Sequence, residues 1–359
     1  MAREPIIKPN TSANSNPKPL EESPDEVNLR PRCMEDIIGQ KEVVKRLRIA
    51  INAAKQRGEV LGHILLDGPP GLGKTTFATC IPAELGVHVD FLSGPAIKAP
   101  KDLLPCLTNL RAQQVLFIDE IHRLPTVVEE FLYTAMEDFR IDLTLGEGLN
   151  SRTHNFRLKP FTLIGATTRA GMLSTPLRDR FLIKEHLRFY SDEELAQIVK
   201  INARKLDVTI DSAAALEIAQ RSRSTPRIAN NRLRWIRDFA QSKASGHITC
   251  QVVSGALEMA EIDSLGLDHQ DREYLRVLTT VFGGGPVGID AIAATLSLSS
   301  DTLADEVEPY LLRSEMITRT PRGRKASAKA FHHMNVPLVN DKNNPGQMSL
   351  PFSTPLDNS

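Results

Sequence analysis

The stretch that decides the fold is DGPPGLGKTTF (67–77), which follows the apolar run HILLD and opens a helical pattern. It has the glycine, lysine and hydroxyl spacing of a phosphate-binding loop, and a strand before it and a helix after it provide the context that this loop requires. The glycines, Gly71 among them, allow backbone N–H groups to surround phosphates, Lys74 neutralises β- and γ-phosphate oxygens, and Thr75 ligates Mg²⁺. A chance glycine-rich turn would not need all of these features. The sequence therefore predicts a site for ATP and Mg²⁺.

Short apolar runs alternate with helical patterns on both sides of this loop, and they lie at 63–67, 87–92, 115–119, 161–166 and 183–189. That alternation predicts a parallel α/β sheet with helices on both faces. Helical periodicity alone follows, and then three helices, two short strands and a basic turn in the order of a winged helix. We expect these parts: a disordered tail (1–28), a sheet domain (29–190), a small all-helical domain (191–265), a winged-helix domain (266–334) and a second tail (335–359).

Composition limits the classes of function. The chain has 44 Lys and Arg and 44 Asp and Glu, so any contact with nucleic acid must come from a local basic patch. The four cysteines are far apart and form neither a disulfide framework nor a zinc motif. No apolar run approaches the roughly 20 residues of a membrane span, and the polar N-terminus lacks a signal-peptide core. We expect a cytoplasmic protein with no membrane partner.

Two acids and two threonines follow buried strands. Four apolar residues, VLFI (115–118), lead into Asp119 and Glu120. These acids lie at the carboxyl end of a strand, which is where doubly wound sheets have their binding sites. Asp119 would then belong to the Mg²⁺ shell and Glu120 would polarise the attacking water. The alternative, that both acids cap the next helix, weakens beside an intact phosphate loop. After FTLIGA, Thr167 or Thr168 would contact the γ-phosphate, or would cap a helix instead.

Three arginines lie at positions that suit anion binding. Arg178 and Arg180 lie on an exposed turn in STPLRDRF, from which an arginine reaches a neighbouring subunit's nucleotide or makes a surface salt bridge. Arg227 begins a helix behind Pro226, where its charge is unfavourable to its own helix dipole, which hints at an anionic ligand.

Two segments suggest contacts with macromolecules. RTPRGRKAS (319–327) has four basic residues between two short strands, which suits phosphate contact by a wing, with Arg322 at its tip; a solvated loop is the alternative. In 141–158, Ile141, Leu143 and Leu145 alternate before a glycine turn, which predicts an inserted hairpin. The hairpin either binds a partner or packs on its own domain.

An ordered series of motifs over 29–333 resembles the RuvB family of AAA+ motors, which drive branch migration of Holliday junctions in bacteria. The series is GPPGLGKTT, LFIDEIHRL, AMEDF, TLIGATTRAG, PLRDRF, STPRIA, GGGPVG, EPYLL and RTPRGR. The resemblance implies an AAA+ ATPase domain, a lid and a winged helix, and a homohexameric ring on duplex DNA at four-way junctions. It also implies that the chain binds RuvA through the hairpin near 141–158, and that it acts together with RuvC in recombination and repair.

The resemblance also implies roles for single residues. It makes Lys74, Asp119, Glu120, Thr168 and Arg180 catalytic, with Thr168 as the first sensor, Arg180 as the arginine finger and Arg178 as the alternative finger. It adds nucleotide contacts from Leu29, Arg30, Thr76, Glu137, Asp138, Phe139, Tyr190 and from Arg227 as second sensor. It assigns DNA contacts to Arg319 and Arg324, beside Arg322 at the tip.

The chain departs from the family pattern at a few positions. Leu182 and Ser224 replace usual glycines, the pair 231–232 alters a usual basic-apolar pair, and the segment with Ser300 replaces one that includes a DNA-contacting arginine. Two other functions compete with a junction motor: a clamp-loader-like ATPase, and a nucleotide-gated regulator that binds DNA without translocating. The tail segment QMSLPF (347–352) resembles the peptide by which bacterial proteins bind the sliding clamp, a pattern that also arises by chance.

Overall fold

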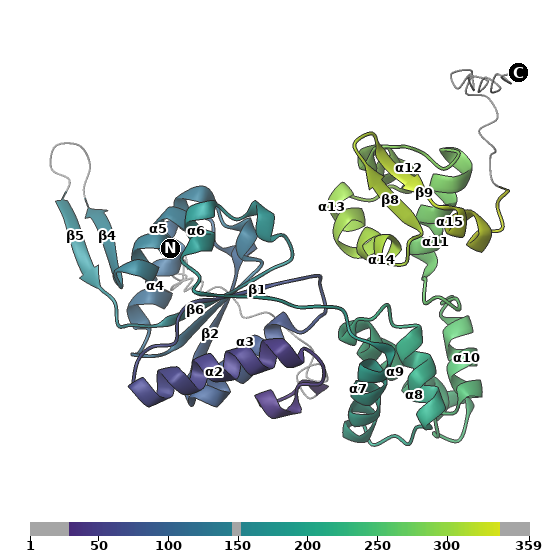
Figure 1. Ribbon diagram of the computed structural model, residues 1–359, viewed down its shortest axis with the longest axis horizontal. Helices are drawn as coiled ribbons and strands as arrows, with labels where there is room; N and C mark the ends of the chain where they lie inside the picture. Colours follow the sequence, from purple (N-terminus) through teal and green to yellow (C-terminus); the bar gives the residue numbers. More distant parts are fainter. Residues whose placement is uncertain (1–28, 146–151, 338–359) are drawn as a thin grey trace, which may run out of the picture. The chain divides into compact units, whose positions relative to one another are not determined.

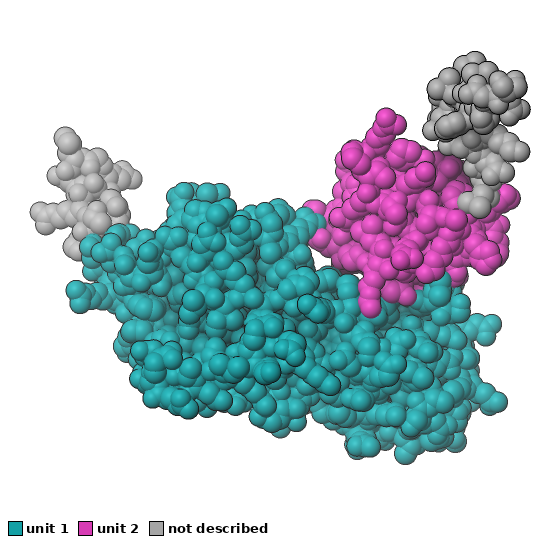
Figure 2. Space-filling model, viewed as in Figure 1, with its two compact units in different colours: residues 1–266 teal, residues 267–359 magenta. Residues whose placement is uncertain are grey.

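The computed structural model describes residues 29–145 and 152–337, and the chain divides after Gly266 into two compact units (Figure 2). The predicted tail 1–28, the clamp-like segment 347–352 and the predicted tail beyond 337 lie outside the described residues. Within the described parts, no helix is both long and apolar enough to cross a membrane.

The first unit is built on a five-stranded parallel sheet in the order β2-β3-β6-β1-β7 (Figure 1). The strands are β1 (Ile64–Asp67), β2 (Val89–Ser93), β3 (Val115–Asp119), β6 (Thr162–Thr167) and β7 (Ile183–His186). Each one coincides with a predicted apolar run, so the predicted parallel α/β sheet is confirmed.

Helices cover both faces of this sheet because successive side chains of a buried strand point to opposite faces. Ile64 and Leu66 join one core, whereas Leu65 between them joins the other. The first core is covered by α2 (Lys41–Arg57) and α3 (Lys74–Leu85), and the second by α4 (Pro100–Asn109), α5 (Thr126–Glu137) and α6 (Thr175–Asp179) (Figure 1). Short 3₁₀ turns complete the domain: η1 (Met34–Asp36), η2 (Gly94–Ala96), η3 (Ile121–Arg123) and η5 (Ala170–Met172).

The predicted hairpin is present as an antiparallel pair, β4 (Arg140–Leu145) and β5 (Arg152–Arg157). Ile141 is fully buried in the second core, whereas Phe156, its partner across the hairpin, is 43% exposed. Ile141 is thus an anchor for the base of the hairpin and is not available to a partner. The side chains of Leu143 and Leu145 lie outside the described residues.

Four helices complete the first unit: α7 (Asp192–Lys205), α8 (Ser212–Gln220), α9 (Pro226–Lys243) and α10 (Cys250–Met259). Their apolar faces continue the core formed by α2 and α3. Ser224 has a φ of +54°, a left-handed conformation that explains why glycine is usual there. Arg232 is buried and donates from Nη2 to the Gly266 carbonyl at 2.9 Å, so this unusual arginine fixes the end of the unit.

The second unit has the predicted order of helices, strand, wing and strand, and the winged-helix fold is confirmed. Its helical segments are α11 (His269–Arg276), η6 (Val277–Val281), α12 (Ile289–Leu296), α13 (Ser300–Thr302), η7 (Leu303–Val307), α14 (Glu308–Arg313) and α15 (Ala328–His333). The wing strands are β8 (Ile317–Thr320) and β9 (Gly323–Ala326).

A third extended segment supports the wing. Val287 and Arg324 exchange two backbone hydrogen bonds of 3.0 and 2.7 Å. A Cβ on Gly285 would lie 2.2 Å from the Arg324 carbonyl oxygen, and a Cβ on Gly323 would lie 2.3 Å from that of Val287. Both positions have positive φ, so the close backbone approach that holds the wing requires glycine at both.

Candidate nucleotide site and basic wing

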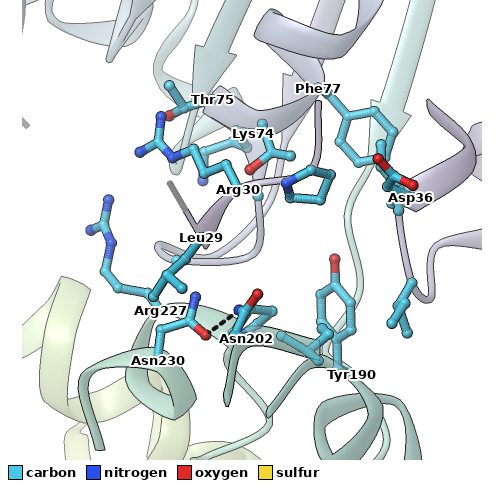
Figure 3. Close-up of a pocket in the computed structure, with 18 of the residues that line it drawn as sticks. Leu29, Arg30, Asp36, Lys74, Thr75, Phe77, Tyr190, Asn202, Arg227 and Asn230 are labelled. Atoms are coloured by element: carbon cyan, nitrogen blue, oxygen red, sulfur yellow. Dashed lines mark hydrogen bonds between the residues drawn. The ribbon is translucent and has the colours of Figure 1, made fainter. Parts of the chain in front are cut away.

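A cavity of about 720 Å³ lies within the first unit, where the phosphate loop faces the helical part (Figure 3). Eleven of the residues predicted to serve ATP line it: Leu29, Arg30, Gly71, Lys74, Thr75, Thr76, Asp119, Glu120, Thr168, Tyr190 and Arg227. In Figure 3, Lys74 and Thr75 lie at one end, and Tyr190 and Asn230 at the other. The chemistry predicted from separate motifs is therefore collected in one place.

The phosphate loop has the backbone geometry that its glycines allow. Gly71 and Gly73 have φ values of +78° and +101°, and α3 begins immediately after them at Lys74. A Cβ on Gly71 would lie 2.7 Å from a methyl group of Thr225, so the loop packs directly on the segment that leads into α9. An anion at the start of α3 would face backbone N–H groups and the positive end of the helix dipole.

The side chain of Lys74 is hydrogen-bonded to the backbone of the phosphate loop. Its Nζ donates to the carbonyl oxygens of Gly68 and Pro69, at 2.6 and 2.9 Å, and its side chain is buried. Burial lowers the pKa of Lys74 to about 8, against the opposing effect of the negative charges of Asp119 and Asp67. The ammonium group therefore loses its proton at a lower pH than an ordinary lysine does.

This pKa predicts that ATP binding weakens as the pH rises. A phosphate group favours the charged lysine, so above about pH 8 binding must take up a proton, and the apparent Kd should rise by up to about tenfold per pH unit. Below that pH, Lys74 contributes no pH dependence. Calorimetry at pH 8.5–9 in buffers of different ionisation enthalpy should report this proton uptake.

A matched control for this effect is Lys205, which lines the same cavity and has a pKa that burial also lowers. Lys205→Gln should retain most of the proton uptake. An affinity that stays constant between pH 7 and 9.5 would contradict the assignment to Lys74.

Two carboxylates leave the end of β3 beside the lysine. Glu120 adopts a left-handed conformation, with φ +49°, and its backbone N–H donates to Asp119 Oδ1 at 2.9 Å. Burial raises the pKa of Asp119, although its hydrogen bond with the Glu120 backbone and the charge of Lys74 act in the opposite direction. Oxygen donors from Thr75 and Asp119 in one cavity are a set that suits Mg²⁺.

The two threonines after β6 have different surroundings. Thr167 is buried; its hydroxyl makes a 3.0 Å hydrogen bond with His122 Nδ1 and accepts one from the Arg169 backbone N–H. Thr168 lines the cavity. Of the two, Thr168 is thus the one placed to meet a nucleotide.

The helical part contributes residues that the motifs did not identify: Asn202, Lys205, Asn230 and Arg234 also line the cavity. Asn202 donates to Asn230 Oδ1 at 2.7 Å, as Figure 3 shows, and Lys205 Nζ donates to the carbonyl oxygens of Leu29 and Arg30. Asn230 lies three residues and Arg234 seven residues after Arg227, so helical periodicity would have placed them on its face.

Five residues expected at a nucleotide do not line this cavity: Glu137, Asp138, Phe139, Arg178 and Arg180. Arg180 donates to Glu137 Oε2 at 2.7 Å and to the Pro176 carbonyl at 2.9 Å, and its guanidinium carbon lies 4.9 Å from the centroid of the Tyr133 ring. Asp138 pairs with Arg140, and Phe139 packs on Phe161. Arg180 and Glu137 thus form a group of their own at the surface.

The predicted DNA contacts lie in the second unit. Arg319 and Arg324 are directly opposed across β8 and β9, and both bind the buried carboxylate of Glu308. Arg322 lies exposed in the turn between the strands. Ser300 lies in the segment that replaces a charged one with a DNA-contacting arginine. It is the first residue of α13, and its hydroxyl donates a hydrogen bond to Asp290 of α12.

Comparisons with known families cover nearly all of the described residues. Residues 29–187 match the Holliday junction DNA helicase RuvB P-loop domain, 190–263 the RuvB AAA lid domain, and 264–335 the RuvB C-terminal winged helix domain. The chain belongs to the RuvB family. Its AAA+ sheet domain, lid and winged helix are those of the family.

Individual relatives agree. The chain is 63% identical over 309 residues to the Holliday junction branch migration complex subunit RuvB of Rhodopirellula baltica. The aligned residues make up 86% of this chain and 84% of that protein. It resembles the solved Thermotoga maritima RuvB Holliday junction branch migration motor, with a TM-score of 0.79, 46% identity and coverage of 86% and 99% of the two chains. A lysine-to-arginine mutant of the same protein matches with a TM-score of 0.80, equal identity and coverage of 86% and 98%.

Proposed function

We propose that this RuvB-family chain is the ATP-driven motor of Holliday junction branch migration in the bacterial cytoplasm, serving recombination and repair. The observation that carries the proposal is the set of groups around one cavity: the phosphate loop, two acids, a threonine and the lid residue Arg227. The same chain carries a winged helix with a basic wing. Such a motor needs two parts, which are a site that hydrolyses ATP and a surface that binds DNA phosphates.

Each group in the cavity has a chemical role in this proposal. Lys74 and Thr76 bind the phosphates, and Thr75 and Asp119 hold Mg²⁺, which when bound neutralises phosphate charge. Glu120 orients and polarises the attacking water, and Thr168 contacts the γ-phosphate. Leu29, Arg30 and Tyr190 border the base, and Arg227 links nucleotide state to the lid.

The group formed by Arg180 and Glu137 suits an assembly of several copies. Both residues lie outside the cavity of their own chain, and Arg180 retains about a third of its side-chain exposure. In a homohexameric ring we propose that Arg180 reaches the neighbour's nucleotide, with Arg178 as the alternative, and that Glu137 to Phe139 border the same site.

We propose that the wing binds duplex DNA through phosphates. Replacing Arg319 or Arg324 by alanine should weaken binding equally for all sequences and lower the slope of log K against log[salt] by about one unit per lost contact. Fluorescence anisotropy with two duplexes of unrelated sequence, over a range of salt concentrations, measures both quantities. A loss confined to one duplex would mean that the wing reads bases.

The partners in this proposal are RuvA, which would bind the hairpin at 141–158, and RuvC. A sliding clamp is a further proposed partner, through residues 347–352. A peptide of this segment should bind purified clamp more tightly than its Phe352→Ala form, because an aromatic anchor fills such pockets. Equal binding of the two peptides would remove the clamp from the proposal.

The ATPase rate of the full chain with and without duplex DNA tests the proposed function. A motor should hydrolyse ATP faster when duplex is bound, because DNA engagement and nucleotide turnover are coupled. A rate that duplex leaves unchanged would favour a nucleotide-gated DNA-binding protein that does not translocate.

A further inference from the structure

Glu308, the first residue of α14, is a carboxylate with no exposed surface. Oε1 accepts hydrogen bonds from the Tyr274 hydroxyl at 2.9 Å and from Arg324 Nε at 2.8 Å. Oε2 accepts them from Arg319 Nε at 2.9 Å and Nη2 at 2.5 Å, and from Arg324 Nη2 at 3.3 Å. One buried acid therefore binds both of the wing arginines that carry the proposed DNA contacts.

The register of the wing explains why an acid is needed there. Arg319 and Arg324 are direct cross-strand partners, and like charges in directly opposed positions destabilise a sheet. Glu308 lies between the two charges and leaves the group with a net charge of about +1. Burial opposes ionisation of Glu308, but hydrogen bonds from Arg324, Tyr274 and Arg319 outweigh it and lower its pKa. The carboxylate is thus ionised at neutral pH.

The hydrogen bonds also fix the orientation of both arginines. Each guanidinium uses the same edge, its Nε and Nη2, to bind the acid. The Nη1 groups take no part in these bonds and remain as donors. The side chain of Arg319 is 49% exposed and that of Arg324 20%, so the pair keeps a face toward solvent.

We propose that Glu308 is a positioning residue for DNA binding, which holds Arg319 and Arg324 side by side so that their free donors meet phosphate groups. The inference rests on the proposed function of the wing. Removal of this negative charge makes the wing more positive, and we nevertheless expect it to weaken DNA binding. If Glu308 only neutralised the arginines, removal of its charge would strengthen DNA binding.

The experiment is Glu308→Gln in the full chain, with duplex affinity measured by anisotropy over a range of salt concentrations. Glutamine keeps the shape of the side chain but no longer orients two guanidinium groups. We expect affinity to fall on the order of tenfold, and the salt slope to fall by about one unit as a phosphate contact is lost. Arg319→Ala should then weaken binding less in the Glu308→Gln background than in the wild type, because the two residues act together.

Two variants keep the test decisive. Glu315→Gln removes the same charge from an exposed residue just before β8, and we expect equal or slightly tighter binding. Tyr274→Phe removes one hydrogen bond to Glu308 and no charge, and we expect a smaller loss in the same direction. If thermal unfolding shows that Glu308→Gln is not folded, the Tyr274→Phe result decides.

The outcomes separate this inference from the function on which it rests. If Arg319→Ala and Arg324→Ala weaken duplex binding while Glu308→Gln leaves it unchanged or tightens it, Glu308 is not a positioning residue and the wing still binds DNA. If neither arginine variant changes duplex binding, the proposed DNA contact of the wing is wrong, and the inference is wrong with it.

Discussion

Replacing Arg180 by alanine is expected to lower the ATPase rate of the assembled protein by about 10³-fold or more, without weakening ATP binding to the isolated subunit. The reason is placement: Arg180 lies outside the cavity of its own chain and pairs with Glu137 on the surface. If Arg180 acts on a nucleotide, as we propose, that nucleotide belongs to a neighbouring copy. Steady-state hydrolysis and equilibrium nucleotide binding, measured on the same preparation, separate the two effects.

Arg178→Ala is the matched control, since Arg178 lies on α6, the short helix that ends just before Arg180, and also lies outside the cavity. We expect its effect on the rate to be far smaller. Mixing Arg180→Ala subunits with Glu120→Gln subunits should restore part of the rate, because a Glu120→Gln copy offers its intact Arg180 to the site of a neighbouring Arg180→Ala copy. A large loss in Arg178→Ala with a normal rate in Arg180→Ala would exchange the two assignments.

Replacing Glu120 by glutamine is expected to reduce hydrolysis by about 10²- to 10⁴-fold while ATP still binds. The amide keeps the shape of the side chain but does not accept a proton from the attacking water. Glu120 lines the cavity next to Asp119, whose carboxylate also accepts a hydrogen bond from the Glu120 backbone, and that bond survives the substitution. Single-turnover hydrolysis together with nucleotide binding provides the measurement.

Glu130→Gln is the control for that substitution, because Glu130 is exposed on α5 and does not line the cavity. It should hydrolyse ATP at the wild-type rate. Unchanged turnover in Glu120→Gln would refute the assignment of Glu120 to the attacking water, and loss of ATP binding would mean that Glu120 supports the loop instead.

The strands and the centre of the nucleotide site could be predicted from sequence because their signals are local. Five apolar runs identified the sheet, and the motif around Lys74 needs only the order strand, loop and helix to place a phosphate. Asp119 followed from the rule that sites lie at the carboxyl ends of parallel strands. These signals depend on neighbours within a few residues along the chain.

The rest depends on contacts between distant parts of the chain. Lys205 reaches the carbonyl oxygens of Leu29 and Arg30, and no pattern within a helix reports such a pair. Glu308 on α14 binds Arg319 and Arg324 on the two strands of the wing. The sequence therefore revealed the arginines but not the acid that orients them. The base of the hairpin is a similar case: alternation left open whether its apolar residues bind a partner or pack on their own domain, and the second core buries Ile141.

The most direct test of a junction motor is movement of a synthetic four-way junction by the full chain together with RuvA and ATP. We predict that the branch point migrates to products only when ATP is present, and that Glu120→Gln gives none. DNA-stimulated hydrolysis with junctions that stay in place would contradict the account, because the protein would then hydrolyse ATP without moving the DNA.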